Sequence, residues 1–184
     1  MFIQTEETPN PATLKFIPGR AVLEGGTADF PTREDAERSP LAHRLFAVPD
    51  VTGVFLGGDF VTVTKSAAVE WHVLKPSVLG AIMEHFTSGE ATLSDASGPA
   101  HAAAAEGDEE IVRQIVELLD TRVRPAVAQD GGDITFHGFD EGVVYLHMQG
   151  SCSGCPSSTA TLKMGIENLL RHYIPEVTSV EAVA

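Results

Sequence analysis

The sequence predicts an α+β protein of two small domains, each with a mixed or antiparallel sheet covered by helices, joined by a flexible acidic linker. Three observations predict this fold class. The length of 184 residues suits two small domains. Strand-like and helix-like patterns occur on both sides of a central stretch. That stretch is small, polar and acidic, with 6 acids and no base over residues 88–110. We therefore expect domains at residues 1–87 and 110–184, with the linker at 88–109.

The first domain opens with a strand and a short helix. Residues 13–17, which are β-branched, aromatic and aliphatic, predict a strand that ends at Pro18. Residues 39–47 predict a helix, because Ser39 is a good N-cap residue and Pro40 suits the first helical position.

A hairpin and a longer helix complete the first domain. Residues 53–56 and 60–64 predict two strands, since the intervening Gly57-Gly58-Asp59 is a typical hairpin turn. Residues 76–86 predict a helix with Pro76 in its first turn. Its expected buried stripe consists of Val78, Leu79, Ile82, Met83 and Phe86.

The second domain is patterned more regularly. Residues 109–124 predict an amphipathic helix, stopped by Gln129-Asp130-Gly131-Gly132-Asp133. Residues 134–139 and 143–148 predict antiparallel strands joined through residues 140–142. Residues 157–173 predict a second helix ended by Pro175, and residues 177–183 predict an edge strand. The residues expected to face the core from the two helices are Ile111, Ile115, Leu118, Leu119, Val123, Leu162, Ile166, Leu169, Leu170 and Tyr173.

Composition excludes several functions. With 26 acids against 12 bases and a net charge of −14, the chain is a poor ligand for nucleic acid or an anionic membrane. No apolar run approaches the ~20 residues that span a bilayer. The acidic opening, with Glu6 and Glu7, is atypical of a targeting peptide, so we expect a reducing cytoplasm. Two cysteines are too few for a disulfide-stapled scaffold.

Both cysteines belong to one motif, Cys152-Ser153-Gly154-Cys155, between a predicted strand and a predicted helix. Pro156 suits the first position of that helix. The N-terminus of a helix favours negative charge through its free N–H groups and its dipole. We therefore expect these thiols to lose their protons more easily than free cysteine does.

Three kinds of chemistry could use this motif. Dithiol exchange is one, although a thioredoxin fold needs more alternating strands and helices than residues 110–184 hold. Zinc binding is the second, with His137, His147 or His172 as further ligands, although the spacing of a zinc finger is absent. An iron–sulfur cluster is the third. It needs four thiolates, which two chains related by a two-fold axis would supply together.

The charge distribution gives weak support to the cluster. Residues 142–165 contain no acid and one base, Lys163, where the chain average predicts about three acids. A cluster with four thiolates is negative, so the absence of carboxylates favours it.

The cysteine motif resembles the signature of the NifU C-terminal domain of the Nfu family. The C-terminal resemblance rests on residues 150–158 and 161–167, together with the upstream Asp130-Gly131-Gly132-Asp133. The first domain resembles the Nfu N-terminal domain at residues 8–11, 15–16, 18–19, 39–42, 54–60 and 62–65.

This resemblance implies an iron–sulfur cluster carrier and not an enzyme. Cys152 and Cys155 of two subunits would bind one [4Fe–4S] cluster, with [2Fe–2S] as the second choice. The implied partners are a second copy of the chain, an upstream cluster scaffold and apo-proteins that receive the cluster. The N-terminal domain would help to recognise those clients. The implied location is the bacterial cytoplasm, or the mitochondrial matrix for a trimmed eukaryotic form.

Overall fold

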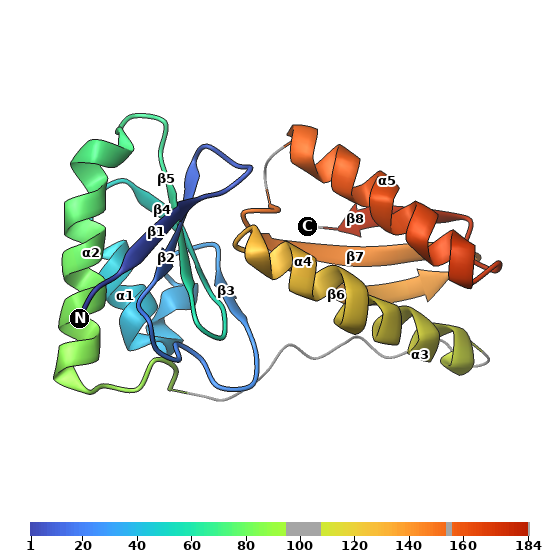
Figure 1. Cartoon of the computed structure of the whole chain (residues 1–184), viewed down its shortest axis with the longest axis horizontal. Helices are drawn as coiled ribbons and strands as arrows, with labels where there is room; N and C mark the ends of the chain where they lie inside the picture. The colour runs from blue at the N-terminus through green and yellow to red at the C-terminus, as the bar shows by residue number, and fades with distance from the viewer. Residues whose placement is uncertain (95–107, 154–155, 184) are drawn as a thin grey trace. The chain divides into compact units, whose positions relative to one another are not determined.

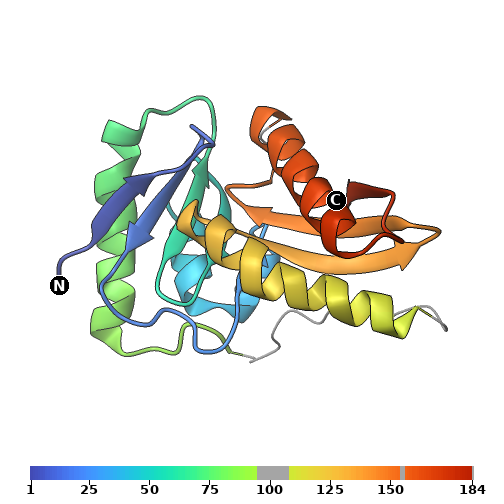
Figure 2. The same cartoon turned by 45° about the vertical axis from the view of Figure 1, so that its right-hand side comes forward.

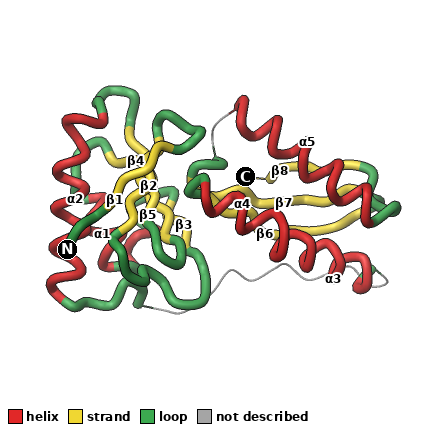
Figure 3. Tube along the Cα trace, in the orientation of Figure 1, coloured by secondary structure: helices red, strands yellow, loops and turns green. Residues whose placement is uncertain are grey.

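The protein divides into two compact units, Met1–Pro99 and Ala100–Ala184. The computed structural model describes residues 1–94, 108–153 and 156–183. Each unit has one sheet with helices packed on one face, as Figure 1 and Figure 3 show, which confirms the predicted fold class. The predicted linker boundaries stay a prediction, because most of residues 88–109 lie outside the described ranges. Within those ranges, no helix is both long and apolar enough to cross a membrane.

The sheet of the first unit has five strands in the order β1-β2-β5-β4-β3, and every neighbouring pair is antiparallel. The predicted strand and hairpin are confirmed as β2, β4 and β5. The two edge strands were not predicted, since three or four residues are too few for a periodic pattern. The strands are β1 (Gln4–Glu7), β2 (Thr13–Ile17), β3 (Ala28–Phe30), β4 (Val51–Leu56) and β5 (Val61–Lys65).

The helical segments η1 (Asp35–Arg38), α1 (Pro40–Phe46) and α2 (Trp71–Ser88) complete this unit. The predicted cap of α1 is confirmed, because Ser39 Oγ accepts a hydrogen bond from the amide of Ala42 at 3.1 Å. The prediction for the start of α2 is wrong. The helix begins five residues earlier, and Pro76 lies inside it, because buried Leu74 anchors an extra turn. Met83 faces solvent and is 42% exposed, contrary to the prediction.

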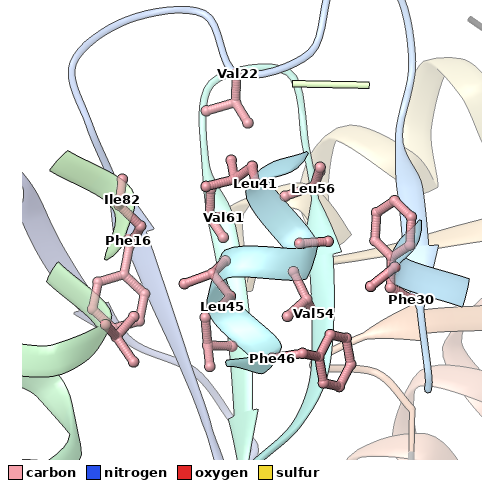
Figure 4. Packing of buried hydrophobic residues seen from close by; sticks show 14 of the residues in the cluster. Phe16, Val22, Phe30, Leu41, Leu45, Phe46, Val54, Leu56, Val61 and Ile82 are labelled. Atoms are coloured by element: carbon pink, nitrogen blue, oxygen red, sulfur yellow. The ribbon is translucent and has the colours of Figure 1, made fainter. Parts of the chain in front are cut away.

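The core of the first unit lies between α1, α2 and one face of the sheet (Figure 4). Leu41 and Leu45 of α1 lie over Val54 and Val61 of the central strands, and Ile82 of α2 lies beside Phe16. Burial of these aliphatic and aromatic side chains is the main stabilising contribution to this unit.

The second unit has a three-stranded mixed sheet in the order β6-β7-β8. β6 and β7 form the predicted antiparallel hairpin, and β8 pairs with β7 in parallel at the predicted edge. Glu141 and Gly142 both have positive φ, as a two-residue hairpin turn requires. The elements are α3 (Glu109–Leu118), η2 (Leu119–Val123), α4 (Arg124–Gln129), β6 (Gly132–Asp140), β7 (Val143–Gly150), α5 (Pro156–Tyr173) and β8 (Ser179–Val183).

Two details of the helices in this unit differ from the predictions. The first helix does not end near Arg124 but continues to Gln129 through the π-helical turn η2. Pro125 follows that turn, and its missing N–H accounts for the local irregularity. Tyr173 is 47% exposed and not inward-facing, while the next residue, Ile174, is buried in the core.

Candidate functional site

Cys152 lies in the loop between the end of β7 and the start of α5. Figure 2 shows β7 in orange and α5 in orange to red. The helix begins at Pro156, as the sequence predicted. Cys155, the second predicted ligand, lies outside the described residues.

The thiol of Cys152 is covered by the core of the second unit. Its side chain belongs to the buried cluster of this unit, and the residue is 7% exposed. The pKa of Cys152 is raised to about 11, mainly by burial; a hydrogen bond with Ser151 lowers it, and the carboxylates of Asp130 and Asp133 make smaller contributions that raise it. The expectation of an easily deprotonated thiol is therefore wrong for Cys152, because burial is the largest effect on its pKa.

A glycine at position 132 makes room for this cysteine. A Cβ atom at Gly132 would lie 2.7 Å from Cys152 Sγ and 2.8 Å from the carbonyl oxygen of Gln149. Both distances are shorter than van der Waals contact, and the second partner is backbone, which cannot rotate away. Only glycine fits at this position while the cysteine loop keeps its path.

Hydrogen bonds tie the cysteine loop to residues 130–133, which we call the glycine turn. The amide of Ser151 donates to the carbonyl oxygen of Gly131 at 3.2 Å, and its hydroxyl donates to the carbonyl oxygen of Asp130. On the other side of the loop, the hydroxyl of Thr159 in α5 donates to the carbonyl oxygen of Cys152 at 3.1 Å. Cys152 is therefore held from both the turn and the helix.

A buried ion pair holds the glycine turn in place. Arg124 donates to both oxygens of Asp133, through Nε at 2.8 Å and Nη2 at 2.9 Å. The Asp133 side chain is 4% exposed and also accepts from the amide of Ile134 at 2.8 Å. Hydrogen bonds to Asp133 raise the pKa of Arg124 above its ordinary value, so the guanidinium stays charged. This two-bond geometry fixes the turn relative to α4.

The predicted histidines do not gather around the cysteine. His137 and His172 are exposed, and His147 is half-buried on the sheet face opposite Leu146 and Met148. Among the described residues, no three histidine, cysteine or acidic side chains form a group that could hold a metal ion.

Sequence reasoning missed the residues that position Cys152. It interpreted the glycine turn as a helix stop and assigned no role to Arg124 or Ser151. An available signal was the pair of glycines flanked by two aspartates, which is more than a helix stop requires. The partner of Asp133 could not be predicted, because the eight residues between it and Arg124 include the end of a helix and a turn.

Comparison with known proteins gives a consistent result over both units. The family described as "Scaffold protein Nfu/NifU N terminal" matches residues 3–89, and the one described as "NifU-like domain" matches residues 115–181. Over 184 residues, the chain is 55% identical to "NFU1 iron-sulfur cluster scaffold homolog, mitochondrial" of Drosophila sechellia and 53% identical to the human protein of the same name.

The chain is fully covered in both alignments but spans 65% of the Drosophila protein and 72% of the human one. A solved structure of a NifU-like protein from Saccharomyces cerevisiae is 26% identical, with a TM-score of 0.47. That similarity covers 52% of this chain and 86% of the yeast chain.

Proposed function

The chain belongs to the family of Nfu and NifU scaffold proteins, and from this premise we propose that it binds an iron–sulfur cluster and delivers it to apo-proteins. The cluster is cargo and the protein performs no catalysis. We assign the cargo as a [4Fe–4S] cluster bound between two copies of the chain by Cys152 and Cys155 of each.

One observation carries this proposal. The chain has two cysteines, both in the motif at residues 152–155, and the described residues supply no further group of metal-binding side chains. A cluster with four thiolate ligands therefore needs the same motif from a second copy. The 142–165 segment itself contains no acidic residue, and the carboxylates that act on Cys152 are those of Asp130 and Asp133 in the glycine turn.

The burial of Cys152 bears on the alternative, dithiol exchange. An oxidoreductase needs a thiolate that is accessible to its substrate, whereas this thiol is covered and its pKa is raised to about 11. Iron binding, in contrast, replaces the proton of a thiol outright.

The proposed cellular location rests on the names of the relatives. The bacterial cytoplasm expected from the sequence stays a prediction. The relatives, whose names include the word mitochondrial, favour the mitochondrial matrix that was its alternative.

Anaerobic reconstitution with ferrous iron and sulfide tests the proposal. We expect a visible charge-transfer absorption, about four irons per two chains by metal analysis, and a dimer by light scattering. Mixing the loaded protein with an apo [4Fe–4S] enzyme and an iron chelator should then restore that enzyme's activity. A monomer that takes up no iron but cycles a Cys152–Cys155 disulfide would contradict the proposal.

The matched variant is Cys155→Ser, which changes one atom of one ligand. It should lose both the cluster and the cluster-dependent dimer while its apo fold, measured by circular dichroism, stays the same. A stable cluster retained by Cys155→Ser would show that four cysteine thiolates are not its ligands.

A further inference from the structure

The first unit contains a groove of about 630 Å³ that plays no part in the cysteine site. Its walls are the edge strand β1, the loop that follows it and the first turns of α2, and β1 runs beside α2 in both Figure 1 and Figure 2. We propose that this groove binds an extended segment of a partner protein. The segment adds to the free edge of β1, with an apolar side chain against Trp71 and an acidic side chain beside Lys75.

Internal hydrogen bonds and two prolines hold the loop wall of the groove. Thr8 Oγ1 donates to the carbonyl oxygen of Thr13 at 2.9 Å, and Asn10 Oδ1 accepts from the amide of Ala12 at 3.0 Å. Pro9 and Pro11 restrict the backbone between these contacts. A preformed wall loses little conformational entropy on binding, which favours affinity.

Trp71 provides an oriented apolar surface in this groove. Its indole Nε1 donates to the carbonyl oxygen of Pro11 at 3.1 Å, and its ring meets Phe16 edge-on at 6.4 Å. The side chain is half-buried and lines the groove. Tryptophans fixed in this way commonly dominate the free energy of protein–protein binding.

The edge of β1 supplies backbone hydrogen-bonding groups. β1 pairs with β2 on one side, and no other strand of the described residues pairs with its other side. Thr5 and Glu7 lie opposite Phe16 and Leu14, so they face the same side of the sheet as the core and line the groove. An added strand would place every second side chain over the same groove.

The charges of the groove select the side chains of the partner. Lys75 and His72 lie on the helix wall and Glu7 on the strand wall, and none of the three makes an ion pair within the described residues. The first turn of α2 contains no acidic residue, and its N-cap residue is Glu70. An acidic side chain of the partner that reaches the helix wall can therefore pair with Lys75, whereas Glu7 disfavours an acidic side chain at the strand wall.

Short synthetic peptides of strand-forming residues test this proposal with the full chain. One peptide carries a leucine and, two positions along, a glutamate; the matched peptide carries lysine in place of glutamate. In nuclear magnetic resonance titrations, the glutamate peptide should shift the amide signals of Thr5–Glu7 and the indole N–H signal of Trp71 in a saturable way. The absence of these shifts up to about 1 mM peptide would overturn the proposal.

Two variants with the same change of charge sharpen the test. Lys75→Glu should weaken binding of the glutamate peptide about tenfold and reverse the preference for the lysine peptide. Arg113→Glu, on α3 of the other unit, should leave both affinities unchanged. Equal affinity of Lys75→Glu and the natural chain for the glutamate peptide would refute the charge assignment.

N-methylation of alternate backbone amides in the peptide tests strand addition itself. One of the two methylated registers should lose binding, because it cannot donate to β1. Binding that survives in both registers would exclude strand addition. All these measurements are independent of the cluster, so the Cys155→Ser chain should give the same affinities even where it binds no iron.

Discussion

Each unit contains a glycine whose lack of a Cβ atom leaves room for a neighbouring side chain, but the two neighbouring side chains have different roles. A Cβ at Gly57 would lie 2.3 Å from the ring of Phe60, which packs on Phe55 with the ring centroids 6.0 Å apart. A Cβ at Gly132 would lie 2.7 Å from the thiol of Cys152. In the first unit the close contact completes packing around a hairpin, whereas in the second it positions a candidate ligand.

An arginine in each unit extends this comparison. Arg44 bridges Glu84 and Glu90, whose side chains are 71% and 49% exposed. Arg124 bridges Asp120 and Asp133, and the Asp133 side chain is 4% exposed. In each network one arginine bridges two carboxylates. The networks differ because one carboxylate of the second, that of Asp133, is buried. The buried ion pair of the second unit holds the glycine turn to which the cysteine loop is hydrogen-bonded, whereas the ion pairs of Arg44 in the first unit are exposed.

The largest expected effect comes from Arg124→Met. This change leaves the buried carboxylate of Asp133 without its cation, and removing one partner of a buried pair costs about 3 kcal/mol of unfolding free energy. Tyrosine fluorescence during urea unfolding reports the second unit, which contains both tyrosines, while Trp71 reports the first. The matched Arg44→Met should change little, because its ion pairs are exposed. Equal losses in the two variants would contradict the comparison.

Gly132→Ala comes next, and it should act mainly on the cluster. The added methyl group displaces Cys152 and the backbone at Gln149, so we expect about tenfold less bound cluster at limiting iron, measured by absorbance after reconstitution. The second unit should lose about 2 kcal/mol of stability from the same strain.

Gly57→Ala is the control for that variant. It should destabilise the first unit by about 2 kcal/mol, since the Phe60 ring must move, and leave the bound cluster unchanged. A loss of cluster in Gly57→Ala comparable to that in Gly132→Ala would show that the effect is not specific to the glycine turn.

The stability of the first unit should also depend on pH through Asp29. Burial, and then the charge of Asp35, raise the pKa of Asp29 from 3.8 to about 6. Between these values the folded state binds more protons than the unfolded state, so the stability of the first unit should fall as pH rises from about 4 to 6. Asp29→Asn should remove this slope and stabilise the unit by about 2 kcal/mol at neutral pH, as measured by Trp71 fluorescence. An unchanged slope in Asp29→Asn would assign it to another group.

The smallest effect is expected for Ser151→Ala. It removes the hydroxyl that donates to the carbonyl oxygen of Asp130 but keeps the hydrogen bond from the Ser151 amide to Gly131. The free energy of unfolding of the second unit should therefore decrease by about 1 kcal/mol. Bound cluster should decrease less than in Gly132→Ala. A larger decrease would mean that the hydroxyl, and not the space at Gly132, controls the loop.

Local signals predicted most of the regular structure. Ser39 and Pro40 marked the start of α1, and Gly57-Gly58-Asp59 marked the hairpin, because caps and turns depend on neighbouring residues. The start of α2 was missed because Glu70 forms no side-chain cap and Pro76 suggested a first turn. The outward Tyr173 was missed because the helical period ends there, and Ile174 takes its place in the core.

The candidate site was only partly predictable for a different reason. The position of the cysteine motif between a strand and a helix followed from the sequence, and so did the helix start at Pro156. The burial of Cys152 did not follow, because serines and glycines around it are typical of an exposed turn. That burial depends on Gly132, which lies twenty residues away in the chain and meets Cys152 only through the pairing of β6 with β7.

The length of the π-helical turn η2 determines how the residues that follow it, up to the glycine turn, are rotated about the helix axis relative to α3. A residue added to or removed from a helix rotates the following residues by about 100°. Deleting one residue of η2, such as Thr121, would therefore turn Arg124 away from Asp133 while leaving every side chain of the pair intact. The length of this turn, counted in single residues, is thus a requirement on the chain that no inventory of side chains would reveal.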